Sequence, residues 1–432
     1  MSTLDLVKEY GPLSWQQAMN LRRNSLLDVS TGQVTATVSL PADEPVERVQ
    51  RRLAEMVRRE EALRITHLPD GGHGPATYRE PFDPPLETVR VDSMEEMGSL
   101  IGEMSEPRFS YRDDKDPRPL WQAVVFDYPD PSGGRARTAF AALDHCLADG
   151  RSGQLFRDEL AGDVVRTARR GGYREWIAWQ HENFPMDGAA KPTPARDFWR
   201  GYFDSSAPNR AAALPFCRPR APMSGLEHHM YREVPVAGHE IAATAAARRV
   251  SPFMLFLACV ASAVGTSTGE TDLTVRYVAH GRIPRYLETL GWFSDYVPLR
   301  IRTADLADPD RALDAALRSR AQLGSHESTP WGYVMQSCGQ TDAETPQVVL
   351  NFSTRSDRVT VLPDTTVAST RGFLYLEASI PRSGKGLLRC RFDPVRFAID
   401  GVDAFVGAVF DPLKRLVAAR PWHGGDDPCT VA

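Results

Sequence analysis

The sequence predicts a mixed α/β protein of two lobes, each with helices packed on a sheet in an α+β two-layer arrangement. The chain has 432 residues, which is enough for two domains with separate cores. Strand-like and helix-like segments follow one another in a mixed order, which favours mixed sheets over a doubly wound nucleotide-binding sheet. The periodicity weakens and prolines recur between residues 171 and 220, so we expect the connection between the lobes there.

The first half of the chain predicts a strand, a helix and a hairpin. Residues Gln33–Leu40 alternate between apolar and polar side chains, as a half-buried strand does. A helix with apolar residues at helical spacing follows, and Asp43 is its expected N-cap. A later helix is expected to run to about Arg170 with Gly162 inside it. Two apolar strands separated by a turn rich in Asp, Pro and Gly are expected to pair as a hairpin: Leu120–Tyr128 and Thr138–Leu143.

The second half continues with further helices and strands. Ser251 and Pro252 form a cap and first-turn pair for one helix, and Asp308 with Pro309 starts another. The remaining patterns predict four strands and a last helix, at Leu273–Ala279, Gln347–Phe352, Gly372–Ala378, Leu387–Phe392 and Val402–Leu416.

Composition and missing motifs exclude several classes of function. The net charge of −5 gives no global attraction to nucleic acid, and the glycine-rich nucleotide-binding motifs are absent. The six cysteines are scattered without zinc spacing, so we expect reduced thiols and no metal site. The longest apolar run, Phe253–Val264, is too short for a bilayer and the N-terminus lacks a basic leader. We therefore expect a cytoplasmic protein that does not bind membranes.

The most informative segment is Asp144–Gly150, which contains a His-x-x-x-Asp-Gly motif between a strand and a helix. His145, at the end of the strand, is a candidate general base, and Asp149 can organise the loop that holds it. A lone histidine at such a position is usually structural, so the spacing alone leaves both interpretations open. Cys146 points to the opposite face of the extended segment and is expected to pack in the core.

Five further segments accompany this motif in order along the chain. Together they resemble the motif series of nonribosomal peptide synthetase condensation domains, and the resemblance covers essentially the whole sequence. The six segments are Pro12–Gln17, Arg59–Arg64, His145–Gly150, Tyr173–Trp179, Gly291–Arg300 and His326–Trp331.

The resemblance implies a fold like chloramphenicol acetyltransferase, with two related lobes forming a V-shaped pseudo-dimer around an active-site tunnel. We place the N-terminal lobe at residues 1–180 and the C-terminal lobe, with its lobe-crossing segments, at residues 181–432. The family pattern implies that His145 faces the tunnel and that Asp149 is structural. Asp149 would form a salt bridge with an arginine, for which Arg282 is the candidate.

The chain departs from the family pattern at three motifs. Asp144 replaces the first histidine of His-His-x-x-x-Asp-Gly, Glu60 replaces another histidine, and Ser294 with Asp295 replaces Val-Asn. The Asp-Phe-Gly-Trp-Gly motif of related plant-type acyltransferases is also missing. The residues expected to line the tunnel are Asp144, Trp292, Ser294, Asp295 and Asn351.

Condensation requires an amine or alcohol to attack a thioester carbonyl through a tetrahedral oxyanion. A neutral imidazole, with a pKa of about 6.5 in model peptides, can accept the proton of the nucleophile. His145 could instead hold the nucleophile in line by a hydrogen bond, and the sequence leaves both roles open. The N–H of Gly150, at the start of the predicted helix, is the candidate donor to the oxyanion.

The predicted function is that of a free-standing condensation enzyme that joins a carrier-bound acyl or aminoacyl thioester to an amine in natural-product biosynthesis. One alternative is an ester-forming O-acyltransferase that uses a carrier-bound or coenzyme A donor. Another is a non-catalytic recruitment domain of the same fold. Recruitment domains typically lose the glycine of the motif, so the presence of His145 and Gly150 favours catalysis.

Carrier proteins acting in trans are the expected partners, because the sequence contains neither an adenylation-domain phosphate loop nor a carrier serine motif. Their phosphopantetheine arms would present the substrates to a monomeric protein that binds no cofactor of its own. Carrier proteins are commonly acidic, so arginine clusters could contact them, at Arg22–Arg23, Arg51–Arg52, Arg58–Arg59 and residues 166–170.

Overall fold

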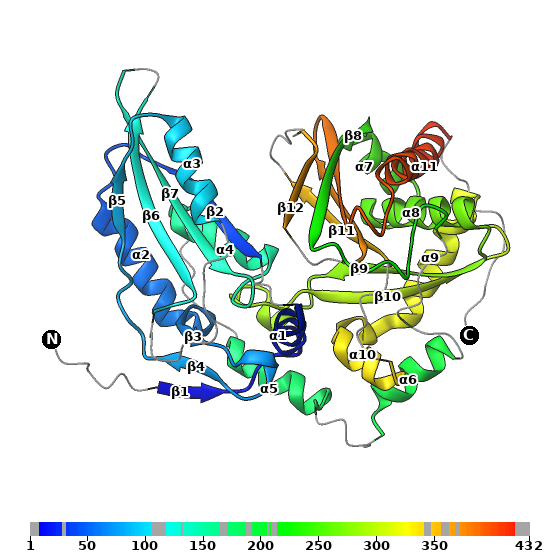
Figure 1. The fold of residues 1–432 in the computed structure, drawn as a ribbon, viewed down its shortest axis with the longest axis horizontal. Helices are drawn as coiled ribbons and strands as arrows, with labels where there is room; N and C mark the ends of the chain where they lie inside the picture. The colour runs from blue at the N-terminus through cyan, green and yellow to red at the C-terminus, as the bar shows by residue number, and fades with distance from the viewer. Residues whose placement is uncertain are drawn as a thin grey trace. The chain divides into compact units, whose positions relative to one another are not determined.

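The computed structural model contains two compact units that are discontinuous in the sequence (Figure 1). The first unit comprises Met1–Lys191, His280–Asp295 and Pro330–Tyr333, and the second comprises the rest of the chain. The division into an N-terminal lobe at residues 1–180 and a C-terminal lobe at residues 181–432 stays a prediction. The structure describes residues 8–27, 32–105, 118–130, 133–163, 171–186, 192–204, 208, 214–340, 347–355, 363–368 and 372–419.

A four-stranded mixed sheet forms the centre of the first unit in the described part of the chain. Its strand order is β2 (Gln33–Leu40), β7 (Arg135–Asp144), β6 (Trp121–Pro129) and β5 (Glu87–Arg90). β7 is antiparallel to both of its neighbours, whereas β5 runs parallel to β6. The predicted hairpin is therefore confirmed, and so is the half-buried strand β2, whose alternate side chains are buried at Ala36, Val38 and Leu40.

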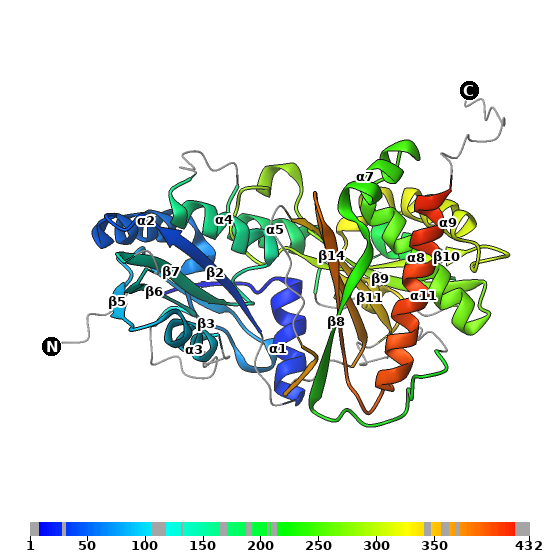
Figure 2. The same cartoon turned by 90° about the horizontal axis from the view of Figure 1, so that it is seen from above.

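Helices cover both faces of this sheet. α2 (Val46–Arg59) and α4 (Gly150–Ala161) pack on one face, where Leu53 and Phe156 join a core cluster with Val125. α3 (Met94–Met104) packs on the other face, so the sheet lies between two helical layers (Figure 2), whereas the two-layer arrangement predicted for each lobe has helices on one face only. The central strands are consequently buried on both sides.

Two predictions about helix ends in this unit are wrong. Asp43 is exposed and does not cap α2, because the helix begins at Val46 after Pro45, an N-cap residue whose side chain accepts no hydrogen bond. α4 ends at Ala161, since Gly162 adopts a left-handed φ of 82° as the C-cap. Gly162 thus terminates the helix that was expected to reach about residue 170, and residues 164–170 lie outside the described residues.

A small antiparallel sheet and two helices also belong to the first unit. The sheet contains β1 (Lys8–Gly11), β4 (Ala76–Arg79) and β3 (Ile65–His67) in that order. The helices are α1 (Trp15–Leu27) and α5 (Tyr173–Asn183), neither of which the sequence patterns predicted. Short 3-10 turns connect these elements at Glu61–Arg64 and Asp70–Gly72.

The second unit contains a seven-stranded mixed sheet in the described residues. β11 runs parallel to β9 and β13, and the pairs β13–β14, β14–β8 and β8–β12 are antiparallel. Four of these strands lie at or near their predicted positions. The strand order is β10 (Asp295–Arg302), β9 (Asp272–Ala279), β11 (Val348–Arg355), β13 (Leu374–Pro381), β14 (Lys385–Phe392), β8 (Leu226–Ala237) and β12 (Thr365–Ala368).

The predicted caps of two helices in the second unit are confirmed. The Ser251 hydroxyl accepts a hydrogen bond from the N–H of Met254, and the Asp308 carboxylate accepts bonds from two N–H groups of α9. The helices α7, α8 and α11 lie on one face of the sheet (Figure 2). The helix bounds are α6 (Pro194–Phe203), α7 (Gly238–Ala247), α8 (Pro252–Thr268), α9 (Pro309–Leu323), α10 (Trp331–Ser337) and α11 (Ile399–Ala418), with 3-10 turns at Pro284–Tyr286 and Gly324–Ser328.

No single helix in the described ranges is long and apolar enough to cross a membrane. α7 and α8 pass that test only as a pair, and they are bent by 95° at the break between them.

We expect Gly162→Ala to destabilise the first unit by about 1 kcal/mol, because a residue with a Cβ is strained at a left-handed φ. Gly98→Ala is the matched control, since Gly98 lies inside α3 with open space around the added methyl group. That substitution should stabilise the protein by about 0.5–1 kcal/mol. Urea unfolding of both variants measures the difference, and equal stabilities would contradict the assigned role of Gly162.

Candidate functional site

The motif loop leaves the end of β7 in a tight turn that Asp144 closes. The side-chain carboxylate of Asp144 accepts a hydrogen bond from the N–H of Cys146 at 2.7 Å. The backbone carbonyl of Asp144 accepts a hydrogen bond from the N–H of Leu147 at 2.9 Å. Asp144 is only 2% exposed. These contacts fix the backbone on both sides of His145.

Side chains of helix α1 form hydrogen bonds with the same turn. The Gln17 side-chain amide donates to the carbonyl of Cys146 at 2.9 Å, and the Asn20 amide lies 3.5 Å from its sulfur. Cys146 is fully buried, which confirms the prediction that it packs in the core. The loop is therefore held by polar side chains of a helix that precedes it by more than a hundred residues.

Asp149 caps helix α4, and its carboxylate also accepts hydrogen bonds from Arg282 and from the backbone of residues 293–294. Its Oδ1 accepts from the N–H of Ser152 at 2.8 Å and from Arg282 Nη2 at 2.9 Å. Its Oδ2 accepts from Arg282 Nη1 at 2.6 Å and from the N–H groups of Phe293 and Ser294, each at 3.0 Å. One buried carboxylate thus joins the motif loop to residues 282–294.

Arg282 is the buried counterion that the resemblance implies for Asp149. Both side chains of this ion pair are 1% exposed. The Arg282 guanidinium also donates to the Ser152 hydroxyl at 2.7 Å and stacks over the ring of Phe293 at 4.1 Å. The Ser152 hydroxyl in turn donates to the carbonyl of Gly291 at 2.6 Å. The network therefore fixes the start of α4 against the segment that carries Trp292.

The charge of Asp149 is maintained by this network. Burial opposes ionisation, but the Arg282 guanidinium and the N–H groups of Ser152 and Phe293 outweigh it and hold the pKa of the carboxyl below its usual value of 3.8. Asp149 is therefore a carboxylate at neutral pH and cannot serve as a general acid there.

His145 is the titratable side chain that this framework positions. Its N–H donates to the carbonyl of Gly32 at 3.1 Å, and its carbonyl accepts from the N–H of Ala148 at 3.3 Å. The imidazole is half-buried and lies against the indole of Trp292, with ring centroids 4.6 Å apart and planes inclined by 58°. The contact with Trp292 restricts the ring while leaving part of it accessible.

Gly150 begins α4 and is exposed. A Cβ added there would have nothing within 4 Å, so there is open space beside this helix terminus. The N–H groups of the first helical turn have no partner within the helix. The amide of Gly150 can therefore donate to an anionic group that lies in front of α4.

Glu60 is a positioning residue that the residue patterns did not reveal. It is 1% exposed, and its Oε2 accepts a hydrogen bond from the N–H of Leu290 at 3.0 Å. Arg59 forms ion pairs with both Glu60 and Glu159 of α4. Its Nε lies 2.9 Å from Glu60 Oε1, and its Nη2 lies 2.5 Å from Glu159 Oε1. The only sequence signal was its place in a family motif, where it replaces a histidine.

Asp295 is also bound within the first unit. Its Oδ2 accepts from the side-chain amide of Gln16 and from the N–H of Trp331, both at 3.0 Å. Gln180 extends this chain by donating to Gln16 at 3.2 Å. The carboxylate thus links α1, α5 and the short segment Pro330–Tyr333, and its expected contact with substrate stays a prediction.

The other predicted site residues are distributed over both units. Ser294 contributes its N–H to Asp149, whereas Asn351 lies on β11 of the second unit opposite Glu377. The structure therefore groups His145, Asp149 and Arg282 with their neighbours in one unit and places Asn351 in the other.

Within the described residues, no cluster of three His, Cys, Asp or Glu side chains could hold a metal ion. The cysteines in those ranges are free thiols, and burial raises the pKa of Cys217 and of Cys338 to about 11. Cys429 lies outside the described residues.

The condensation domain family model matches residues 20–369. The chain belongs to the condensation domain family. A curated relative, the hybrid PKS-NRPS synthetase iccA of Talaromyces variabilis, is 26% identical over 167 residues, which are 36% of this condensation domain. The match spans only 4% of the length of that relative.

Solved structures share the fold of this condensation domain over nearly its full length. The condensation domain of the monacolin K polyketide synthase MokA is 14% identical with a TM-score of 0.75, covering 97% of this chain and 99% of its own. The X-domain from teicoplanin biosynthesis is 14% identical with a TM-score of 0.74, covering 98% and 97%. SgcC5 of Streptomyces globisporus is 20% identical with a TM-score of 0.67, covering 94% and 99%. The predicted mixed α/β condensation-domain fold is thus confirmed.

We expect Asp149→Asn to destabilise the condensation domain by about 3–5 kcal/mol, because the substitution leaves the Arg282 charge buried without its counterion. Asp158→Asn is the matched control on the same helix, where the carboxylate is partly exposed and the change should cost less than about 1 kcal/mol. Chemical unfolding followed by tryptophan fluorescence measures both. Equal losses in the two variants would contradict the importance of the Asp149–Arg282 pair.

The contribution of Asp149 to stability should depend on pH in one direction. Because its folded-state pKa lies below the ordinary value of 3.8, the contribution is fully present above that value and is lost as the pH falls through the folded-state pKa. The stability gap between wild type and Asp149→Asn should therefore be constant between about pH 7 and pH 5 and shrink only in stronger acid. A gap that closes near neutral pH would contradict this assignment.

Proposed function

We propose that this condensation domain transfers an acyl or aminoacyl group from a carrier-bound thioester to an amine and so forms an amide bond in natural-product biosynthesis. The observation that carries the proposal is the His145 imidazole, half-buried on a loop whose turn and following helix are fixed by Asp144 and Asp149. A rigid histidine beside an open helix N-terminus offers a proton acceptor and an oxyanion donor in one loop.

In the proposed reaction the amine nitrogen attacks the thioester carbonyl carbon. His145 accepts the amine proton or orients the nitrogen by a hydrogen bond, while the N–H of Gly150 stabilises the oxyanion. The tetrahedral intermediate collapses with cleavage of the C–S bond, and the proton from nitrogen ends on the departing thiolate. Asp149 stays ionised throughout and acts by holding the loop.

The proposed partners are carrier proteins, whose phosphopantetheine thiol would present the donor, together with an amine acceptor. No bound cofactor is required, since proton transfer and oxyanion stabilisation use side-chain and backbone groups alone. A hydroxyl acceptor would give an ester by the same steps, but it demands more of the base because an alcohol is less acidic than an ammonium group. Amide formation therefore remains the first proposal.

The alternative function is that of a non-catalytic recruitment domain, and similarity of fold is its only support. The X-domain from teicoplanin biosynthesis has a similar fold and forms a complex with OxyB. The presence of both His145 and Gly150 supports catalysis over recruitment. The two functions differ in whether the imidazole is needed.

We expect His145→Ala to lower the rate of condensation by about a hundredfold or more, since general acid–base catalysis contributes that much. The assay incubates the protein with a donor-loaded carrier and either an amine or an alcohol acceptor, and mass spectrometry detects the product. His239→Ala, at an exposed position on α7, is the control and should leave the rate unchanged.

Full product formation by His145→Ala would contradict the catalytic role of this histidine. A product only with alcohol acceptors would replace amide formation by ester formation. No product with either acceptor from folded wild-type protein, across a panel of carriers, would favour recruitment.

A further inference from the structure

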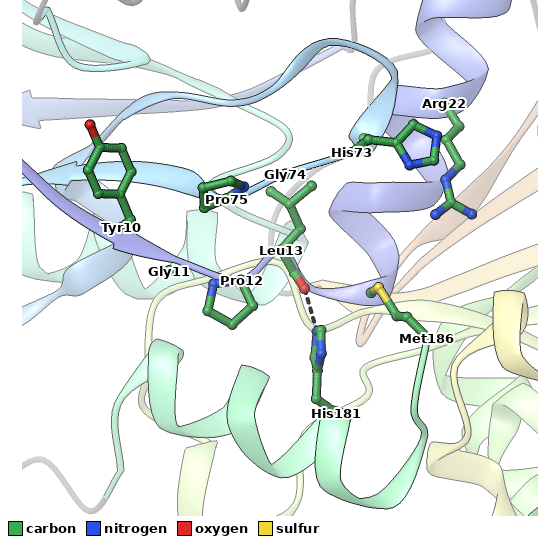
Figure 3. Close-up of a pocket in the computed structure, with 11 residues that line it drawn as sticks. Tyr10, Gly11, Pro12, Leu13, Arg22, His73, Gly74, Pro75, His181 and Met186 are labelled. Atoms are coloured by element: carbon green, nitrogen blue, oxygen red, sulfur yellow. Dashed lines mark hydrogen bonds between the residues drawn. The ribbon is translucent and has the colours of Figure 1, made fainter. Parts of the chain in front are cut away.

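A hollow on the first unit lies apart from the contacts that hold the motif loop (Figure 3). Its volume is about 670 Å³, within the range of small-molecule sites. The residues around it come from the end of β1, from α1, from the loop after the Asp70–Gly72 turn, and from α5 with the residues that follow it. Four separate segments thus build one concave surface.

Arg22 of α1 supplies the positive charge of this hollow. Its Nε is buried and has no hydrogen-bond partner in the part of the chain that the structure describes. None of the residues that line the hollow is an aspartate or a glutamate. A guanidinium that faces no acidic side chain gains from an anion, which forms charge-assisted hydrogen bonds with its terminal N–H groups.

His73 is presented beside Arg22 by a glycine-rich loop (Figure 3). Gly71, Gly72 and Gly74 have left-handed φ values of 66°, 68° and 107°. A Cβ at Gly72 would lie 2.4 Å from the carbonyl oxygen of Ala18, so only glycine allows this loop to pack so closely on α1. The imidazole of His73 therefore projects from a loop with a defined conformation.

His181 forms a fixed wall on the opposite side of the hollow. Its Nε2 donates to the carbonyl of Leu13 at 2.7 Å, which orients the ring (Figure 3). Apolar groups continue this wall, since Pro12, Pro75 and Met186 line the hollow together with Tyr10, a side chain that is 62% exposed. The hollow thus combines one cationic end with an apolar bed.

We propose that this hollow binds a small organic monocarboxylate with an apolar body. Arg22 would pair with the carboxylate through its planar fork, and the apolar residues would cover the body of the ligand. The apolar residues beside the guanidinium favour an organic carboxylate over inorganic phosphate, which has no apolar body for them to cover. The site is separate from acyl transfer and does not depend on the proposed function.

Methyl-labelled methionine gives a direct probe of this site, because Met186 lines it. We expect phenylacetate to shift the Met186 methyl resonance with half-saturation in the range of about 1 mM, as for a ligand of about ten heavy atoms. The uncharged phenylacetamide and inorganic phosphate should each bind about tenfold more weakly. Met186→Leu assigns the resonance.

Arg22→Gln should weaken phenylacetate binding by about tenfold or more. Arg23→Gln is the matched control, since Arg23 carries the same charge on the same helix, donates to Asn20 and does not line the hollow. Thermal unfolding checks that both variants are folded.

Equal binding of phenylacetate and phenylacetamide, or unchanged binding by Arg22→Gln, would overturn the proposal. So would the absence of a Met186 shift with phenylacetate.

Discussion

The arrangement of the candidate active site depends on a single buried ion pair. Asp149 and Arg282 are separated by 133 positions in the sequence and are both removed from water. Burying two charges is costly, and the cost is offset only where hydrogen bonds satisfy both partners. The Asp149 carboxylate meets this condition with N–H donors from the guanidinium and from three backbone amides. The position of His145, four residues earlier, follows from that anchoring.

The three departures from the family motifs share one physical role. Asp144, Glu60 and Asp295 are carboxylates at positions where the family has histidine, histidine and asparagine. Each of them accepts a hydrogen bond from a backbone N–H, which belongs to Cys146, Leu290 and Trp331 respectively. These three carboxylates therefore anchor the backbone of the first unit, and they differ in charge from the residues of the family pattern.

Local sequence signals predicted the elements whose cause is local. The β6–β7 hairpin and the Ser251 cap were identified because turn residues and capping residues act within a few positions of themselves. The end of α4 was missed because Gly162 can occupy either a helix interior or a left-handed cap. Leu290, whose N–H donates to Glu60, lies 230 positions away, and the periodicity of a sequence cannot predict contacts over such a separation. The pairing of Asp149 with Arg282 came from the family resemblance alone.

The discontinuity of the first unit has a consequence for synthesis of the chain on the ribosome. Asp149 is made early, but Arg282 follows 133 residues later, after the whole of the second unit's first segment, Pro192–Ala279. At roughly 5–20 residues per second, the nascent carboxylate waits about 7–27 s for its counterion. During that interval the start of α4 lacks its main tertiary contact. The first unit can therefore reach its final packing only after the ribosome has made residues 192–279 of the second unit and then residues 280–295 of the first. A nascent chain that stalls between these points would expose core surface to chaperones and proteases.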